Sequence, residues 1–212
     1  DPAGTQRHIN LMKQNGDRMS IFLHAPPADI DLNLDKIETL ITESELVIPN
    51  IAPHCKQFIP LLRKYQPEIW YDLHDYDGED DYYNEFIAQA DVIFFSSEGT
   101  DNYQQIMDEL VTQGKRLLVC THGSQGATAL SASEGWIKVP AVDYQVVDTN
   151  GAGDNFFAGV LYGYLNDYGL EKSLQLGSIM GGLAVTSQEL VASAVDTQTL
   201  LAEYQDKFRA ES

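Results

Sequence analysis

Hydrophobic positions along this chain follow two alternating patterns. Apolar runs of about five residues, typical of buried β-strands, are separated by longer segments in which apolar residues recur every three or four positions, as on one face of a helix. The strand candidates are residues 7–11, 18–24, 45–49, 69–73, 91–95, 116–120, 128–130 and 136–139. The helix candidates are residues 34–41, 54–65, 103–111, 157–165, 173–187 and 197–208, with one further helix that ends near Ala90.

Strands that alternate with helices predict an α/β fold, in which a mostly parallel sheet is covered by helices on both faces. Residues 7–24 form an expected hairpin, because Asn15 and Gly16 are typical of a tight hairpin turn. Ligands of such sheets bind beyond the carboxyl ends of the strands. The residues expected there are Asp72, 96–98, 121–126 and the loop at 148–154. No repeat, low-complexity stretch or linker divides the chain, so residues 1–212 are predicted to form a single domain.

Composition narrows the class of protein. A chain of 212 residues with 43% hydrophobic residues can bury a sizeable core. The net charge of −19 argues against nucleic acid and anionic membranes as partners. The two cysteines, Cys55 and Cys120, lack metal-ligand spacing and are expected to be buried free thiols in a reducing compartment. With no signal peptide and no apolar run of membrane-spanning length, a cytoplasmic protein is predicted.

The loop at residues 148–154 carries the strongest chemical signal. Gly151 and Gly153 lack a Cβ, so the backbone amides of residues 151–154 can approach a bound group closely. A helix follows, and the positive end of its dipole favours an anion such as phosphate at the same place. Asp154 adds a carboxylate, which suits a base that takes a proton from an attacking hydroxyl. The alternative is that Asp154 only caps the helix.

The complete string, Asp-Thr-Asn-Gly-Ala-Gly-Asp-Asn-Phe at residues 148–156, closely resembles the C-terminal signature D-T-x-G-A-G-D-x-F of the ribokinase-like (PfkB) family of sugar and nucleoside kinases. The resemblance implies the family's fold, a three-layer α/β sandwich with a mostly parallel sheet. It also implies that Asp154 is the catalytic base. The amides of Gly151, Ala152, Gly153 and Asp154 then form an anion hole for the transferred phosphoryl group.

Two further segments resemble nucleotide-binding parts of the family. Residues 121–126, Thr-His-Gly-Ser-Gln-Gly, resemble its T-x-G-x-x-G loop, which implies that Thr121, Gly123 and Gly126 line the ATP site. An ordinary glycine-rich turn is the alternative, and the family pattern assigns no role to His122. Residues 182–193 resemble the segment that closes over adenine, which implies a contact from Ser193, although the Gly-Ala that usually precedes this serine is absent.

Two strand ends depart from the family pattern. At the end of the strand at 91–95, Ser96 stands where the family's N-x-x-E has asparagine, and Gly99 stands where it has glutamate. Serine at this place is similar to the ketohexokinase-like branch, and Ser96 is retained as a nucleotide-binding candidate. Glu98 lies one residue early, so it is either a metal ligand or a surface carboxylate.

The second departure follows the strand at 69–73. Asp72 fits the first position of the family's D-x-N-x-R strand end, whereas His74 and Tyr76 replace the asparagine and the arginine. A phosphate-side role for Asp72 and a role in capping the following turn are both consistent with the sequence.

The resemblance therefore implies an ATP-dependent kinase that phosphorylates a hydroxyl group of a sugar or related small polyol, with Mg²⁺ bound to ATP. A monovalent cation and a homodimer are further candidates. A nucleoside kinase is the alternative within the family, and a non-catalytic nucleotide-binding or interaction homologue is the alternative outside enzymes. Family members are longer on the N-terminal side, where most of the lid that holds the sugar lies. The chain is accordingly expected to be truncated on its N-terminal side, with residues 7–24 as a remnant of the lid and its return strand.

Overall fold

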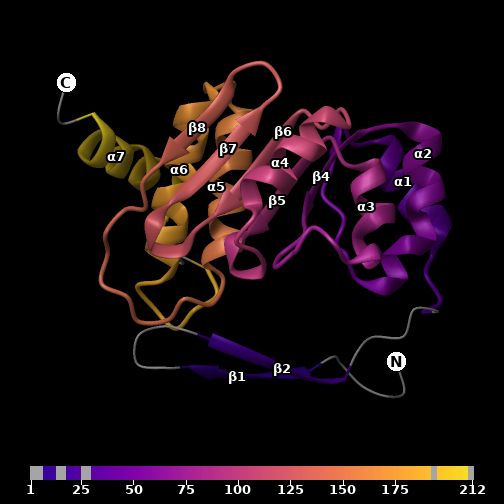
Figure 1. The fold of residues 1–212 in the computed structure, drawn as a ribbon, viewed down its shortest axis with the longest axis horizontal. Helices are drawn as coiled ribbons and strands as arrows, with labels where there is room; N and C mark the ends of the chain where they lie inside the picture. The colour runs from indigo at the N-terminus through magenta and orange to yellow at the C-terminus, as the bar shows by residue number, and fades with distance from the viewer. Residues whose placement is uncertain (1–6, 13–17, 25–29, 192–194, 210–212) are drawn as a thin grey trace. The chain divides into compact units, whose positions relative to one another are not determined.

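The structure is a computed structural model, and it describes residues 7–12, 18–24, 30–191 and 195–209. Its main sheet has six strands in the order β3-β4-β5-β6-β7-β8 (Figure 1). These strands are β3 (Leu46–Val47), β4 (Glu68–Asp72), β5 (Val92–Ser96), β6 (Leu117–Thr121), β7 (Ala127–Ser131) and β8 (Gly135–Val139). β3 pairs in parallel with β4, and β4 pairs in parallel with β5, with Trp70 opposite Val92. The predicted α/β fold with a mostly parallel sheet is confirmed.

A second, two-stranded sheet is formed by β1 (Arg7–Met12) and β2 (Arg18–His24). Both strands were predicted, whereas the turn at residues 15–17 lies outside the described residues. Successive side chains of a strand point to opposite faces, so every second residue lies on the same face. The residues Ile9, Leu11, Met19, Ile21 and Leu23 follow this spacing and are exposed.

The described residues form seven α-helices. They are α1 (Leu34–Thr42), α2 (Ile59–Tyr65), α3 (Asn84–Gln89), α4 (Tyr103–Thr112), α5 (Ala152–Leu165), α6 (Leu170–Ala184) and α7 (Thr197–Phe208). The prediction of one helix over residues 54–65 is wrong, because a 3-10 helix at Pro53–Phe58 precedes α2. Pro60 explains the break, since proline has no N–H and is tolerated only in the first turn of an α-helix. None of the described helices is long and apolar enough to cross a membrane.

Contacts divide the chain into two compact units. The first contains Asp1–Ile9, Ser20–Cys120 and Ala129–Trp136, and the second contains Asn10–Met19, Thr121–Thr128 and Ile137–Ser212. The single domain expected from the sequence stays a prediction, and each unit is described separately below.

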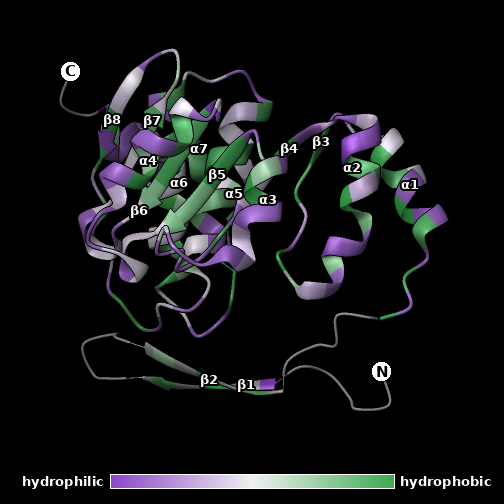
Figure 2. Cartoon of the chain, turned by 45° about the vertical axis from the view of Figure 1, so that its right-hand side comes forward, coloured by the Kyte–Doolittle hydropathy of each residue, from purple (hydrophilic) through white to green (hydrophobic). Residues whose placement is uncertain are grey.

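The core of the first unit is built on strands that are apolar along their whole length. Residues Val92 to Phe95 of β5 are each at most 2% exposed, and β5 is coloured as hydrophobic in Figure 2. Such continuous runs are typical of parallel strands that are covered on both faces. Cys55 and Cys120 are buried and form no disulfide, as predicted. Burial raises the pKa of the Cys120 thiol to about 12, which keeps it in the unreactive protonated form.

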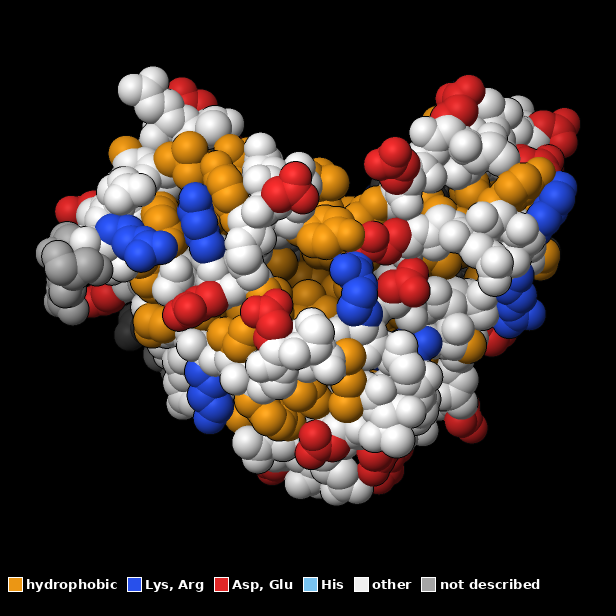
Figure 3. Space-filling model, turned by 90° about the horizontal axis from the view of Figure 1, so that it is seen from above, with side chains coloured by type: hydrophobic (Ala, Val, Ile, Leu, Met, Phe, Trp, Pro, Cys, Tyr) orange, Lys and Arg blue, Asp and Glu red, His pale blue; other side chains and the backbone are white. Residues whose placement is uncertain are grey.

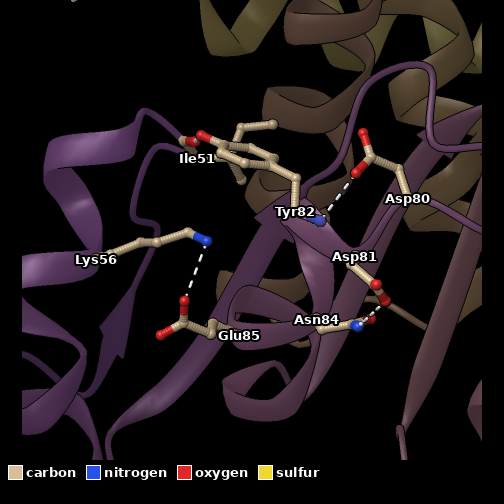
Figure 4. Close-up of polar contacts among 7 residues, drawn as sticks. All are labelled: Ile51, Lys56, Asp80, Asp81, Tyr82, Asn84 and Glu85. Carbon is tan, nitrogen blue, oxygen red and sulfur yellow. Dashed lines mark hydrogen bonds and ion pairs between the residues drawn. The ribbon is translucent and has the colours of Figure 1, made fainter. Parts of the chain in front are cut away.

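The acidic, tyrosine-rich segment that follows β4 is held onto the first unit by side-chain contacts (Figure 4). The Tyr82 hydroxyl donates a hydrogen bond to the carbonyl of Ile51. Lys56 Nζ lies 4.7 Å from the centre of the Tyr82 ring and forms a 3.1 Å ion pair with Glu85. Asp80 accepts a 2.9 Å hydrogen bond from the Tyr82 amide. Acidic side chains of this segment therefore cap turns and form ion pairs. On the face of the molecule seen in Figure 3, acidic side chains are scattered and do not form one continuous patch.

Glycines allow the helices of the second unit to pack closely. A Cβ on Gly159 of α5 would lie 2.7 Å from the carbonyl oxygen of Leu176 in α6. A Cβ on Gly177 of α6 would lie 2.8 Å from Val160 of α5. Helix α7 packs onto α6 through an apolar cluster that includes Ile179. This packing fixes α5, at whose start the 148–154 loop lies.

Candidate functional site

The loop before α5 owes its shape to Gly151. Gly151 is the N-cap of α5 and has φ +80°, a conformation that side chains disfavour. A Cβ at this position would lie 2.4 Å from the carbonyl oxygen of Leu190. The Asn150 amide donates a 2.8 Å hydrogen bond to Asp148 Oδ1, which closes the turn before the glycine. The fold of the second unit therefore requires glycine at residue 151.

Gly153 is in a different situation. It is exposed and lies in the first turn of α5, and a Cβ there would have no atom within 4 Å among the described residues outside its own part of the helix. The amides of Gly153 and Asp154, the second and third residues of α5, have no acceptor within the helix. The Ala152 amide donates a 3.3 Å hydrogen bond to the carbonyl of Thr149, so it is less available. Helix-terminal amides without an intrahelical acceptor, beside a residue that has no side chain, are what a phosphate group needs.

Asp154 lies in the first turn of α5 and is exposed. The N-cap of the helix is Gly151, and no side chain forms a capping hydrogen bond there. The alternative that Asp154 caps the helix is therefore wrong. Its carboxylate is available to a ligand that approaches the start of α5.

The chain that enters this loop is anchored to the other helices of the second unit. The amides of Val147 and Asp148 both donate to the carbonyl of Val185, at 2.7 and 3.2 Å. Further upstream, the Tyr144 hydroxyl donates a 2.6 Å hydrogen bond to Glu203 of α7. A rigid scaffold therefore holds the amides of the loop, as a pre-formed anion site requires.

The glycine-rich turn after β6 contains two glycines with distinct roles. Gly126 has φ +93°, and a Cβ there would lie 2.1 Å from the carbonyl oxygen of Val139, so the fold requires this glycine. Gly123 has φ +54° and is exposed, with no atom of the described residues within 4 Å of a Cβ. The turn is closed by a 2.8 Å hydrogen bond from the His122 amide to the carbonyl of Gly126. Thr121 is the last residue of β6.

The ring of His122 is turned into the protein. Its Nε2 lies 2.9 Å from Thr128 Oγ1, and the two atoms share a hydrogen bond. Burial, with a smaller contribution from Lys138, lowers the pKa of His122. The ring is therefore neutral at pH 7 and occupied by a structural contact.

In the first unit, the strand-end residues form turn caps. Ser96 Oγ accepts a 3.1 Å hydrogen bond from the amide of Glu98, at the start of the 3-10 helix Ser97–Gly99. Glu98 is exposed. Asp72 Oδ1 accepts a 2.9 Å hydrogen bond from the amide of His74, whose φ is +54°, so the turn-capping role of Asp72 is confirmed. Among the described residues, no three His, Cys, Asp or Glu side chains form a group that could hold a metal ion. Ser193 lies outside the described residues.

Comparison with known proteins assigns the family. The profile of the pfkB family of carbohydrate kinases matches residues 72–198, which is more than half of the chain. The chain belongs to this family. The match includes the 121–126 turn and the 148–154 loop, in which Gly123 and Gly153 face open space. Kinases of the pfkB family use ATP.

The relatives of this pfkB-family chain act on different substrates. It is 30% identical over 204 residues to the acarbose 7(IV)-phosphotransferase of Actinoplanes sp., which covers 94% of the chain and 68% of the relative. It is 28% identical over 170 residues to the ATP-dependent 6-phosphofructokinase of Thermoanaerobacterium thermosaccharolyticum, which covers 76% of the chain and 52% of the relative. The chain thus spans about half to two thirds of the length of these proteins.

Solved structures show the same fold. The microbiome-derived acarbose kinase Mak1 has a TM-score of 0.82 and 27% identity, and the match covers 94% of this chain and 68% of that one. The Burkholderia thailandensis nucleoside kinase in complex with inosine has a TM-score of 0.75 and 20% identity, with 97% and 68% covered. The ribokinase-like fold expected from the sequence is confirmed.

Asn155 is a residue of the site that the sequence analysis missed. It follows Asp154 directly and is only 5% exposed. Its Nδ2 donates hydrogen bonds to the carbonyls of Gly151, at 2.8 Å, and Leu190, at 2.9 Å. The available signal was a carboxamide directly before two phenylalanines at the buried start of a helix, where a polar side chain needs partners.

Proposed function

We propose that this chain carries the nucleotide-binding and catalytic part of an ATP-dependent kinase, which phosphorylates a hydroxyl group of a sugar or related small polyol. The observation that carries the proposal is the open space at Gly153, directly before the exposed and non-capping carboxylate of Asp154. The fold does not require glycine at residue 153. A phosphoryl group that approaches the amides does require it, because a Cβ would block the approach.

The proposed reaction transfers the γ-phosphoryl group of ATP. The substrate oxygen attacks the γ-phosphorus while its proton moves to the carboxylate of Asp154, and the bond to the β-phosphate oxygen breaks to release ADP. The amides of Gly151, Gly153 and Asp154, supported by the α5 dipole, stabilise the negative charge on the transferred group. The Ala152 amide contributes less because of its bond to Thr149.

ATP is proposed to lie along the 121–126 turn, where exposed Gly123 leaves room at the backbone and Thr121 ends β6. Ser96 and Ser193 stay proposed contacts. Mg²⁺ neutralises the phosphate charge when it is bound. The described residues form no group of three His, Cys, Asp or Glu side chains that could hold a metal ion. Mg²⁺ would therefore be held mainly by the phosphates of ATP and by water, and Glu98 is the side chain proposed as a ligand. A monovalent cation and a homodimer stay predictions.

The substrate is proposed to be a carbohydrate. Two relatives whose matches cover 94% of the chain are kinases of acarbose, and others act on fructose phosphates and deoxygluconates. The exposed apolar residues of β1 and β2 support a role for this hairpin in covering a substrate, as expected for a remnant of the lid. A nucleoside kinase is the second candidate, supported by the similarity to the inosine-bound nucleoside kinase.

The test is ADP release by the full-length gene product with a panel of acceptors. The panel contains acarbose, fructose 6-phosphate, ribose, inosine and adenosine, each with ATP and Mg²⁺. We expect ADP release that depends on a carbohydrate and is lost in Asp154→Asn. Release that depends only on a nucleoside would favour the second candidate. Nucleotide binding without any turnover would favour a non-catalytic homologue.

A further inference from the structure

The carboxamide of Asn155 joins two segments that are far apart in sequence. Its two N–H hydrogens are both used, one by the carbonyl of Gly151 and the other by the carbonyl of Leu190. The two segments lie close together at this point, because a Cβ on Gly151 would lie 2.4 Å from Leu190 O. Asn155 therefore sits at the point where the bend at residues 187–191 meets the start of α5.

The Gly151 carbonyl controls the geometry of the loop amides. It belongs to the same rigid peptide plane as the N–H of Ala152, so fixing the oxygen fixes the direction of that plane. The oxygen accepts two hydrogen bonds from Asn155, one from the backbone N–H at 3.0 Å and one from Nδ2 at 2.8 Å. Glycine has the softest backbone of all residues, and Gly151 at φ +80° gains no rigidity from a side chain of its own.

Asparagine can bind both carbonyls, whereas residues of similar size or chemistry cannot. An aspartate has the same shape but only acceptor oxygens, which would face two carbonyl oxygens. Serine or threonine offers a single donor, so one of the two carbonyls would lose its partner. The carbonyl that loses its donor would no longer be tied to residue 155, so the link between the start of α5 and Leu190 would be broken.

We infer that Asn155 is a positioning residue, which holds the Gly151 carbonyl, and with it the first turn of α5, so that the amides of Gly153 and Asp154 face the transferred phosphoryl group. The inference rests on the proposed function, in which these amides stabilise the transition state. Asn155 itself touches neither substrate nor nucleotide.

The first test measures kinetics in the full-length gene product, with Asn155→Ala and Asn155→Asp. We expect kcat to fall about 10- to 100-fold, the effect of a misplaced catalytic group, while KM for the sugar is unchanged. The matched control is Asn166→Ala, which removes a 2.8 Å bond of the same kind, from Nδ2 to the carbonyl four residues earlier, at the other end of α5. The control should keep wild-type kcat. If neither Asn155 variant folds, Asn155→Ser retains one donor and should give an intermediate kcat.

The second test does not depend on turnover. Inorganic phosphate is titrated into labelled protein, and the NMR shifts of the Gly153 and Asp154 amides are followed. We expect phosphate to shift both amides in the wild type, and the shifts to be reduced in Asn155→Ala but not in Asn166→Ala. A purely structural role of Asn155 would lower the melting temperature without changing these shifts in the folded variant.

The outcomes separate the two proposals. A wild-type protein that phosphorylates no carbohydrate, yet shows phosphate shifts that Asn155→Ala reduces, would reject the sugar kinase and support the positioning role. A folded Asn155→Ala variant with wild-type kcat and wild-type shifts would overturn the positioning role. Absence of phosphate shifts in the wild type would overturn it as well.

Discussion

Replacement of Asp154 by asparagine is the most direct test of the proposed chemistry. The asparagine side chain has the same shape as the aspartate, and the position is exposed, so no core contact changes. No capping hydrogen bond is lost, because Gly151 is the N-cap and no side chain caps α5. The expected cost in stability is limited to the interaction of one negative charge with the helix dipole, about 0.3–1 kcal/mol.

The expected effect on catalysis is much larger. Loss of a general base lowers kcat by about 10²–10⁴, which corresponds to about 3–5 kcal/mol of transition-state stabilisation. ATP affinity should stay the same or rise slightly, since a negative charge beside the phosphates is removed. The assay is sugar-dependent ADP release, measured together with the melting temperature.

Asp35 provides the matched control for this substitution. It is exposed and acidic in the first turn of α1, in the first unit, so Asp35→Asn removes the same charge from a comparable helix position. Both variants should lose similar, small amounts of stability, and only Asp154→Asn should lose turnover. Near-normal kcat in Asp154→Asn would refute the assignment of Asp154 as the base.

Three further substitutions test the loop and its anchor. Gly153→Ala should stabilise α5 by up to about 1 kcal/mol, because alanine is the better helix former and its methyl group meets no described atom outside its own part of the helix. Phosphate binding and kcat should nevertheless both fall, and calorimetry with ADP measures the loss of phosphate binding. Gly151→Ala should lose about 1–3 kcal/mol in urea unfolding, from its positive φ and the contact with Leu190. Tyr144→Phe should lose about 1–3 kcal/mol in the same measurement, since Glu203 loses its donor.

The sequence predicted most strands because their apolar runs are buried in the structure. Residues 91–95 and 116–120 were expected as strands, and the structure has them one residue later. Periodicity failed at residues 54–65, where the apolar positions continue through Pro60 although the backbone hydrogen bonds cannot. The expected strand at 45–49 has only two paired residues, because pairing with β4 is confined to Leu46 and Val47.

In the candidate site, the sequence showed which residues were present but not the structural reason for each of them. Gly151 and Gly153 look equivalent in the string, and only the carbonyl of Leu190 distinguishes a glycine that the fold requires from one that faces open space. Asn155 was missed for the same reason, since its second acceptor lies 35 residues away in sequence. Contacts across such separations leave no periodic pattern. The cap formed by Asp72 was predictable because its partner is two residues away.

The departures from the family pattern lie at two strand ends and not in the loop to which the proposed mechanism assigns phosphoryl transfer. Ser96 and His74 replace family residues at the ends of β5 and β4, where the structure shows side chains that cap turns. Stabilisation of the transferred group is assigned instead to backbone amides at the start of α5, and a backbone amide is retained whatever the side chain. What these amides need is a glycine at 153, a fixed peptide plane at 151 and a helix behind them, and all three are present. In the proposed mechanism, the altered strand ends therefore change the substrate or metal environment and leave the phosphoryl-transfer site intact.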